Sequence, residues 1–159
     1  MSPRTLLLLL PLLSSLLSCS STPPAGKLIE GHLRPCPNRP NCVSSENGGS
    51  APVAPISFRS SPEQAWQIMQ TVIERLGGKI SDRGPTYLWA TFSSRFCRFV
   101  DDVELRLETE EKIMHIRSGA RVGYADFGVN RKRVETIRKL FTEQENQPHR
   151  PAPSGTKPQ

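Results

Sequence analysis

The apolar positions between residues 61 and 142 change their spacing along the chain, and each spacing predicts a different kind of element. After Ser61 they recur every three or four residues, which is typical of an amphipathic helix. Ser61 can cap this helix, Pro62 suits its first turn, and Gln64 completes a capping box. We expect the helix to end at Gly77-Gly78, because glycine accepts the left-handed conformation that closes a helix. Its apolar stripe consists of Ala65, Trp66, Ile68, Met69, Val72, Ile73 and Leu76.

Beyond residue 79, apolar and polar residues alternate, which predicts antiparallel strands. We expect a short strand at Ile80 and longer strands over residues 87–95, 100–108 and 112–118. Simple hairpins between these strands place inward-facing residues opposite one another. The expected pairs are Phe92 with Val103, Leu105 with Ile116, and Leu107 with Met114.

The residues on the other face of these strands are polar, and we expect this face to be open to water. They are Trp89, Thr91, Asp102, Glu104, Arg106, His115 and Arg117. The register places Glu104 beside Arg117 and Arg106 beside His115, with Trp89 in reach of a cation–π contact with Arg106. Such a face is either a docking surface or a solvated sheet face with cross-strand charge pairs.

Helical spacing returns near the end of the chain. The second helix is expected to begin between Asp126 and Asn130 and to bury Val134, Ile137, Leu140 and Phe141. A short strand at Ile56 and Phe58 precedes the first helix. The order β-α-β-β-β-α predicts an α+β fold in two layers, with an antiparallel meander of about four strands covered by two helices.

The first 18 residues read as a secretory signal. Arg4 precedes a Leu-rich run over residues 6–17, which is shorter than the roughly 20 apolar residues of a comfortable membrane span. A buried core helix is the alternative. The run ends in Leu16-Leu17-Ser18-Cys19, which resembles a bacterial lipobox. The resemblance implies cleavage before Cys19 and a diacylglyceryl thioether on its sulfur, whereas the alternative is an ordinary signal peptide with an incidental cysteine.

Lipidation at Cys19 would make the membrane the first partner of this chain. We then expect a lipid-anchored protein of the bacterial membrane, placed at the outer membrane and facing the periplasm. Residues 1–18 form the signal peptide, 19–33 a flexible tether, 34–142 a single α+β domain, and 143–159 a disordered tail. The net charge of +6 comes from basic residues interleaved with acids, which does not favour nucleic acid as a partner.

Two more cysteines lie close together in a Pro-rich segment. Outside the cytoplasm Cys36 and Cys42 favour a disulfide, although free thiols or a metal-bound pair remain alternatives. Cys97 is left over, either as a small buried residue or as a lone thiol. His32, His115 and His149 are scattered and build no metal site, so we expect no metal and no cofactor.

Three segments resemble a known family. They are residues 36–45 (CPNRPNCVSS), residues 99–104 (FVDDVE) and residues 117–133 (RSGARVGYADFGVNRKR). Together they are similar to the uncharacterised bacterial and plastid family called domain of unknown function 1499, over about residues 33–142. The family has no established reaction, so the resemblance implies a fold and no catalytic residues. Gly119 departs from the family's pattern, in which serine or alanine is common.

The third segment holds the candidate site. Glycines at 123 and 128 allow tight turns before a helix N-terminus, which can bind an anion. The candidate residues for an anion or a partner protein of the envelope are Arg117, Arg121, Asp126, Asn130, Arg131 and Arg133. The alternative is an internal network, in which Asp126 or Asn130 caps the helix and the arginines pair with Asp101, Asp102 and Glu104.

A catalytic set is hard to assemble from the remaining residues. Asp101 and Asp102 point to opposite faces of a strand and cannot form a carboxylate dyad, and a set of Cys97, His115 and Asp101 spans a turn and two strands. We therefore expect a non-enzymatic domain that binds a ligand or partner. The alternatives are an enzyme for an anionic envelope substrate, with Asp101 or Asp102 as base, and a structural or assembly factor.

Overall fold

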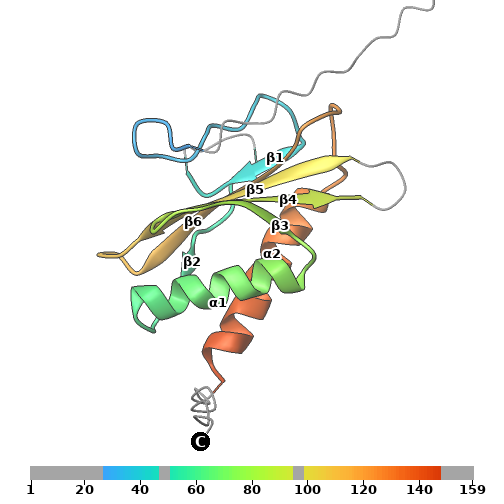
Figure 1. The fold of residues 1–159 in the computed structure, drawn as a ribbon. Coiled ribbons are helices and arrows are strands. Elements are labelled where there is room, and N and C mark those ends of the chain that lie inside the picture. The colour runs from blue at the N-terminus through green and yellow to red at the C-terminus, as the bar shows by residue number, and fades with distance from the viewer. Residues whose placement is uncertain (1–26, 47–50, 95–98, 148–159) are drawn as a thin grey trace, which may run out of the picture.

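A single antiparallel sheet with two helices on one face makes up the domain (Figure 1). The computed structural model describes residues 27–46, 51–94 and 99–147. Helix α1 (Pro62–Arg75) and helix α2 (Val129–Glu145) both lie below the sheet in Figure 1, and the first described residues, 27–41, lie above it. This arrangement confirms the predicted α+β class.

Both helices form where the apolar spacing predicts them. The hydroxyl of Ser61 accepts a hydrogen bond from the backbone N–H of Gln64 at 3.2 Å, and Gly77 takes a φ of +84° directly after α1. Helix α2 begins after Gly128, within the predicted interval. The two helices bury their stripes in one core, whose fully buried members include Ala65, Met69, Val72, Ile73, Val134, Ile137 and Phe141.

The predicted meander is present as four consecutive strands. They are β3 (Lys79–Arg83), β4 (Tyr87–Ser93), β5 (Val100–Glu108) and β6 (Ile113–Ala120). The predicted pairs of Leu105 with Ile116 and Leu107 with Met114 are confirmed. The prediction that Phe92 pairs with Val103 is wrong, because Phe92 lies opposite Asp101 and Ala90 lies opposite Val103. The shift is two residues, so every side chain keeps its face.

Two short strands extend the sheet beyond β6. Strand β2 (Ile56–Ser57) lies near the predicted position and pairs Ile56 with Met114. Strand β1 (Cys42–Ser44) pairs Cys42 with Gly119, and the sequence did not predict a strand in this Pro-rich segment. The strand is three residues long, too short to show alternation. A disulfide joins Cys42 to Cys36, just before the strand.

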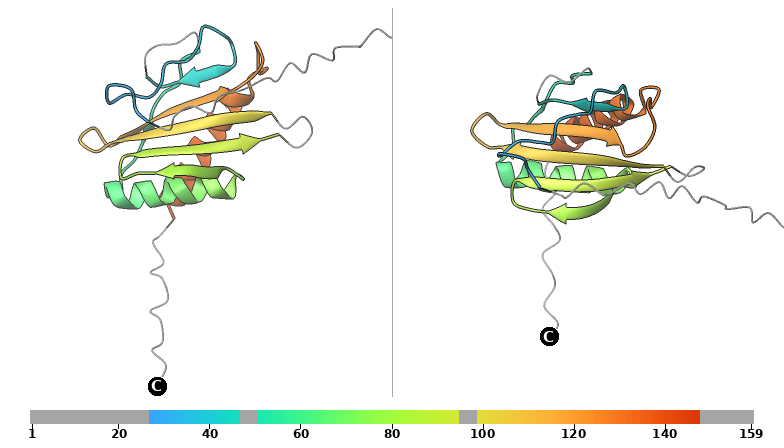
Figure 2. Two further views of the ribbon diagram at one scale, coloured as in Figure 1. Left: turned by 45° about the horizontal axis from the view of Figure 1, so that its top comes forward. Right: turned by 90° about the horizontal axis from the view of Figure 1, so that it is seen from above.

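The polar face of the meander is not open to water, and this prediction is wrong. Residues 32–46, which we call the N-terminal strap, include β1 at the edge of the sheet, and the residues before β1 lie on the side of the sheet opposite the helices (Figures 1 and 2). Asp102, Glu104 and Arg117 are consequently buried, although their side chains point away from the helices. The domain therefore has an apolar core on one face of the sheet and a covered charged layer on the other.

The folded part is slightly longer than residues 34–142. Leu33 is buried, and its backbone N–H donates to a carboxylate oxygen of Glu46. Helix α2 extends to Glu145, whose Oε1 accepts hydrogen bonds from the backbone of Arg59 and Ser60. Residues 1–26, with Cys19, and residues 148–159 lie outside the described residues, as does Cys97. Among the residues described, no helix combines the length and apolar character needed to cross a bilayer.

Candidate functional site

Arg117 belongs to the charged layer under the strap. Its Nη1 lies 2.9 Å from Oε2 of Glu104, and the hydroxyl of Tyr87 donates to Oε1 of the same carboxylate at 2.8 Å. Burial, followed by the charge and hydrogen bond of Glu104, raises the pKa of Tyr87 far above its usual range. The carboxylate thus joins three neighbouring strands through buried contacts, and this predicted cation faces an acid within the protein.

Arg121 closes the same layer at its far edge. Its guanidinium donates to Asp102 through Nε at 2.9 Å and through Nη2 at 2.8 Å, and this hydrogen bonding raises the pKa of Arg121. Trp89 donates its indole N–H to the same carboxylate at 2.8 Å, and Arg121 lies 5.9 Å from the centroid of the Trp89 ring. The expected cation–π partner of Trp89, Arg106, instead contacts Glu46 and Glu108.

Arg133 and Asn130 belong to the helix side of the sheet. Arg133 lies 2.7 Å from Asp101 and 4.9 Å from the ring centroid of Phe92. Its Nη1 donates to the side-chain oxygen of Asn130 at 2.6 Å, and that oxygen also accepts from the hydroxyl of Ser118. Asp101 and Asp102 therefore point to opposite faces, as their adjacency in a strand requires.

Asp126 shapes the loop that leads into α2. Its carboxylate accepts from the backbone N–H of Gly128 at 3.0 Å and from that of Asn130 at 2.9 Å. Partial burial opposes its ionisation, but these hydrogen bonds prevail and lower the pKa of Asp126. Asp126 thus occupies N–H groups at the start of α2 that an anion would need.

Arg131 is exposed on the first turn of α2. Its guanidinium donates to the backbone carbonyl of Pro52 at 3.0 Å and makes no ion pair among the described residues. Of the predicted cations, Arg131 alone is exposed, whereas Arg117, Arg121 and Arg133 each pair with a carboxylate. The arrangement matches the alternative of an internal network more closely than it matches an open anion pocket.

Two of the histidines that are far apart in the sequence meet at Glu46. Its Oε1 lies 3.8 Å from Nδ1 of His32, 3.7 Å from Nδ1 of His115 and 2.7 Å from Nη2 of Arg106. Burial lowers the pKa of His115, against the opposing charge of Glu46. No group of three His, Cys, Asp or Glu side chains suited to a metal ion occurs in the described part of the chain. Glu46 is therefore a structural junction between the strap and strands β5 and β6.

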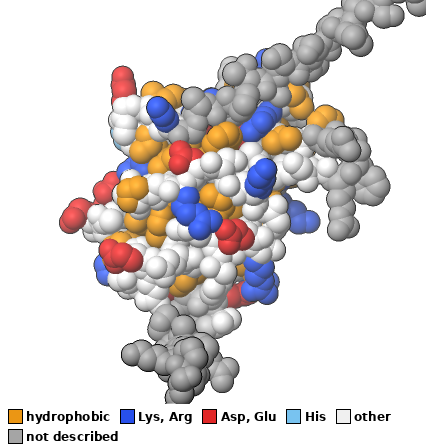
Figure 3. Space-filling view, viewed as in Figure 1, with side chains coloured by type: hydrophobic (Ala, Val, Ile, Leu, Met, Phe, Trp, Pro, Cys, Tyr) orange, Lys and Arg blue, Asp and Glu red, His pale blue; other side chains and the backbone are white. Residues whose placement is uncertain are grey.

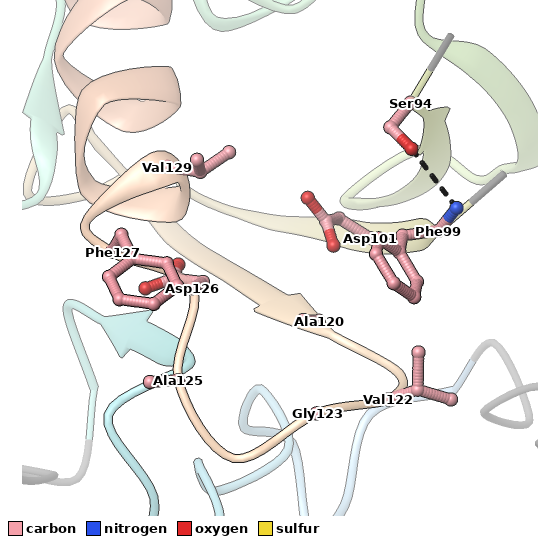
Figure 4. A pocket seen from close by; sticks show the side chains of 10 residues that line it. All are labelled: Ser94, Phe99, Asp101, Ala120, Val122, Gly123, Ala125, Asp126, Phe127 and Val129. Carbon is pink, nitrogen blue, oxygen red and sulfur yellow. Dashed lines mark hydrogen bonds between the residues drawn. The ribbon is translucent and has the colours of Figure 1, made fainter. Parts of the chain in front are cut away.

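An apolar pocket of about 250 Å³ lies between the start of β5 and the loop over residues 121–128 (Figure 4). We call it the Phe127 pocket. Its apolar lining consists of Phe99, Ala120, Val122, Ala125, Phe127 and Val129. The two carboxylates in the lining, Asp101 and Asp126, are already bound to Arg133 and Asn130. The pocket is smaller than the roughly 300–1,000 Å³ that hold whole drug-sized ligands, so it suits one apolar group of a larger molecule.

The rim of this pocket exposes large apolar side chains. Phe127 is 98% exposed and Tyr124 is 72% exposed, and Phe99 and Val129 are about half exposed. Phe127 also has a φ of +53°, a conformation that costs a non-glycine residue roughly 1–2 kcal/mol. Among our candidates, sequence reasoning selected the cations of this segment and missed these aromatics. Tyr124 and Phe127 could have indicated this surface, because both are aromatic and neither belongs to the buried apolar stripe of α2.

A family model described as a protein of unknown function (DUF1499) matches residues 32–141. This range contains all of the core and the Phe127 pocket. A search of curated proteins gives no match to the chain.

Proposed function

The chain belongs to the DUF1499 family, whose description gives no function, and we propose a function from the residues of the chain itself. The protein is a lipid-anchored domain of the bacterial cell envelope. It binds an apolar group in the Phe127 pocket and does not catalyse a reaction. The observation that carries the binding role is a pocket with an apolar lining and a rim of exposed aromatics. Exposed apolar surface is costly to leave in water and commonly marks a site of interaction.

The chemistry of the lining supports binding rather than catalysis. A general acid or base needs a carboxylate that is free to exchange a proton with a substrate. Asp101 instead lies 2.7 Å from Arg133, and Asp126 accepts three hydrogen bonds from Gly128 and Asn130. A ligand entering this pocket therefore meets carbon surface, with its polar groups left at the rim.

The cations of the predicted site contribute in two ways to this proposal. Arg121 and Arg133 hold the strand ends and the start of α2 in place through their acids. Arg131 and Lys132 stay exposed at the first turn of α2, beside Val129 of the lining. They supply positive charge next to an apolar opening, which suits an amphipathic ligand with an anionic head.

The pocket is tested with the fluorescent apolar probe N-phenyl-1-naphthylamine and the chain from Ser20 onward. Ala125→Phe fills the pocket, so it should reduce the fluorescence gain of the probe. Ala54→Phe makes the same change at an exposed position outside the lining and should leave that gain unchanged. Equal binding by both variants would overturn the pocket as the site.

The anchor is tested separately in growing bacteria. Radioactive palmitate should label the wild-type chain and should not label Cys19→Ser. Absence of label from the wild-type chain would overturn the lipid anchor, and the binding site would then have to be explained for a protein that is not attached in this way.

A further inference from the structure

We infer that the Phe127 rim docks on the surface of an anionic phospholipid bilayer, with Tyr124 and Phe127 inserted among the lipid head groups. This inference names the binding partner for the pocket and rests on the proposed anchor at Cys19. Three kinds of observation on the folded domain and the length of the preceding chain support it.

Exposed apolar side chains gather on one side of the molecule. The large apolar residues that are exposed in the described part of the chain are Ile29, Phe99, Tyr124, Phe127 and Val129. Four of them are at the Phe127 pocket or in its loop. The fifth lies in the turn just before the strap. This distribution is typical of a protein that meets an apolar phase with one face.

The loop that carries the aromatics is held rigidly against the strap. The side-chain amide of Asn41 donates to the carbonyl of Gly123 at 2.7 Å, and the N–H of Asp126 donates to the carbonyl of Pro40 at 3.4 Å. The carboxylate of Asp126 accepts hydrogen bonds from the backbone N–H groups of Gly128 and Asn130, and Phe127, between Asp126 and Gly128, stands in the left-handed region. These contacts hold Phe127 in an unfavourable backbone conformation, and in this conformation its ring is almost fully exposed.

Unpaired positive charge lies beside this rim. Arg131 and Lys132 are exposed at the start of α2 and make no ion pair among the described residues, whereas Arg121 and Arg133 are paired with Asp102 and Asp101. Arg39 is exposed beside Pro40, the residue that contacts the loop. Lysine and arginine beside an apolar insertion are attracted to the negative surface potential of anionic lipids. On the face of the molecule that Figure 3 shows, cations and acids are interspersed.

The length of the tether brings this side to the bilayer. Lys27, the first described residue, is eight positions after Cys19, a length of chain that reaches roughly 28 Å at full extension. A domain of this size has a diameter of about 35 Å, so the side with Lys27 stays near the membrane. In Figure 1 residues 27–41 and the loop over residues 121–128 lie above the sheet, whereas α2 ends below it. Docked in this way, the pocket opens toward acyl chains, which are the apolar group it would take.

The test uses the lipidated full chain in vesicles of phosphatidylethanolamine and phosphatidylglycerol that contain lipids brominated on the acyl chains. Phe127→Trp adds a fluorophore at the rim, and Lys139→Trp adds one on an exposed position near the far end of α2. Trp66 and Trp89 contribute the same background fluorescence to both variants. The wild-type chain, which has only these two tryptophans, measures that background. Tryptophan at 127 should be quenched and blue-shifted, and tryptophan at 139 should remain unquenched.

The charge contribution is tested in the Phe127→Trp background. Lys132→Glu should reduce the quenching, and Lys139→Glu, the same change two turns further along α2 and away from the pocket, should not. Chain that associates with the vesicles but shows equal quenching at positions 127 and 139 would overturn the docking and leave the anchor intact. Chain that does not associate with the vesicles at all would overturn the anchor on which the docking rests.

Discussion

Arg121 holds the carboxylate of Asp102 with two hydrogen bonds, at 2.9 Å from Nε and 2.8 Å from Nη2. Asp102 is only 3% exposed, and its remaining contact is the indole N–H of Trp89. The guanidinium is therefore what makes a buried negative charge tolerable at this edge of the sheet. Arg121 therefore differs from Arg131, which the sequence placed in the same candidate site but which binds no carboxylate among the described residues.

Arg121→Met should lower the free energy of unfolding by about 3 kcal/mol, because it leaves a buried charge without its partner. Arg131→Met should change it by less than about 0.5 kcal/mol, since this side chain is exposed and contacts one backbone carbonyl. Urea denaturation measures both values. Adding Asp102→Asn to Arg121→Met should restore part of the loss. Equal and small effects of both arginine variants would contradict a structural role for the Arg121–Asp102 pair. Arg121 would then be a candidate to bind a ligand.

Phe127→Asn should raise stability while it removes the docking. Asparagine adopts the left-handed region more readily than phenylalanine does, and a ring that is 98% exposed gives up almost no buried area. We expect a gain of up to about 1 kcal/mol in urea denaturation. Vesicle association of the rim should fall in the same variant. A loss of stability would instead mean that the ring packs against the domain in solution.

Gly119→Ala should destabilise the domain by about 1–3 kcal/mol, the usual cost of overpacking. A Cβ at position 119 would lie 2.9 Å from Sγ of Cys42 and 3.2 Å from its Cβ, so the disulfide and strand β1 would have to shift. Thermal unfolding measures the loss. The control is Gly84→Ala, where a Cβ would lie 3.3 Å from the backbone oxygen of Tyr87 and 3.8 Å from its nitrogen, with no closer contact. The close approach explains why this chain carries glycine at 119, and an undiminished melting temperature would refute that explanation.

His115 should make the domain less stable as the pH falls below 6.5, the ordinary pKa of histidine. Burial lowers the pKa of His115 in the folded state, so in this range the unfolded chain binds the proton and the folded chain does not. Stability is therefore fully present above the unfolded pKa and is lost as the pH drops toward the folded pKa. His115→Gln should flatten the decline in unfolding free energy between about pH 7.5 and about pH 5.5. An unchanged slope would show that another group titrates.

The meander and both helices were predictable because their signals are periodic and local. The alternation in strands β4 to β6 places Leu88, Leu105 and Ile116 on the buried face whatever the hairpin length. The length of the connection between β4 and β5 was not predictable, because residues 95–98 contain no glycine, proline or asparagine that would mark a turn. The result was a two-residue error in the pairing of Phe92 that left every face correct.

The covering of the polar face could not be read from the sequence. The strap has no periodic pattern, and its contacts are made by single residues such as Glu46 and Asn41 with partners far along the chain. The same reason explains the candidate site. Arginines and acids in one segment are visible in the sequence, but whether they face each other depends on the register of β5 with β6 and on the position of α2.

The strap also fixes the order in which the parts of the domain can reach their final positions. Asn41 bonds to Gly123, 82 residues later, and its carbonyl accepts from Asn130, 89 residues later. Contacts this distant in sequence cannot form until the whole meander exists. The strap is thus synthesised before the strands that it covers and reaches its final position after them. Until the strap packs on the sheet, the acids and arginines of β5 and β6 remain hydrated, and the polar face of the sheet is exposed to water.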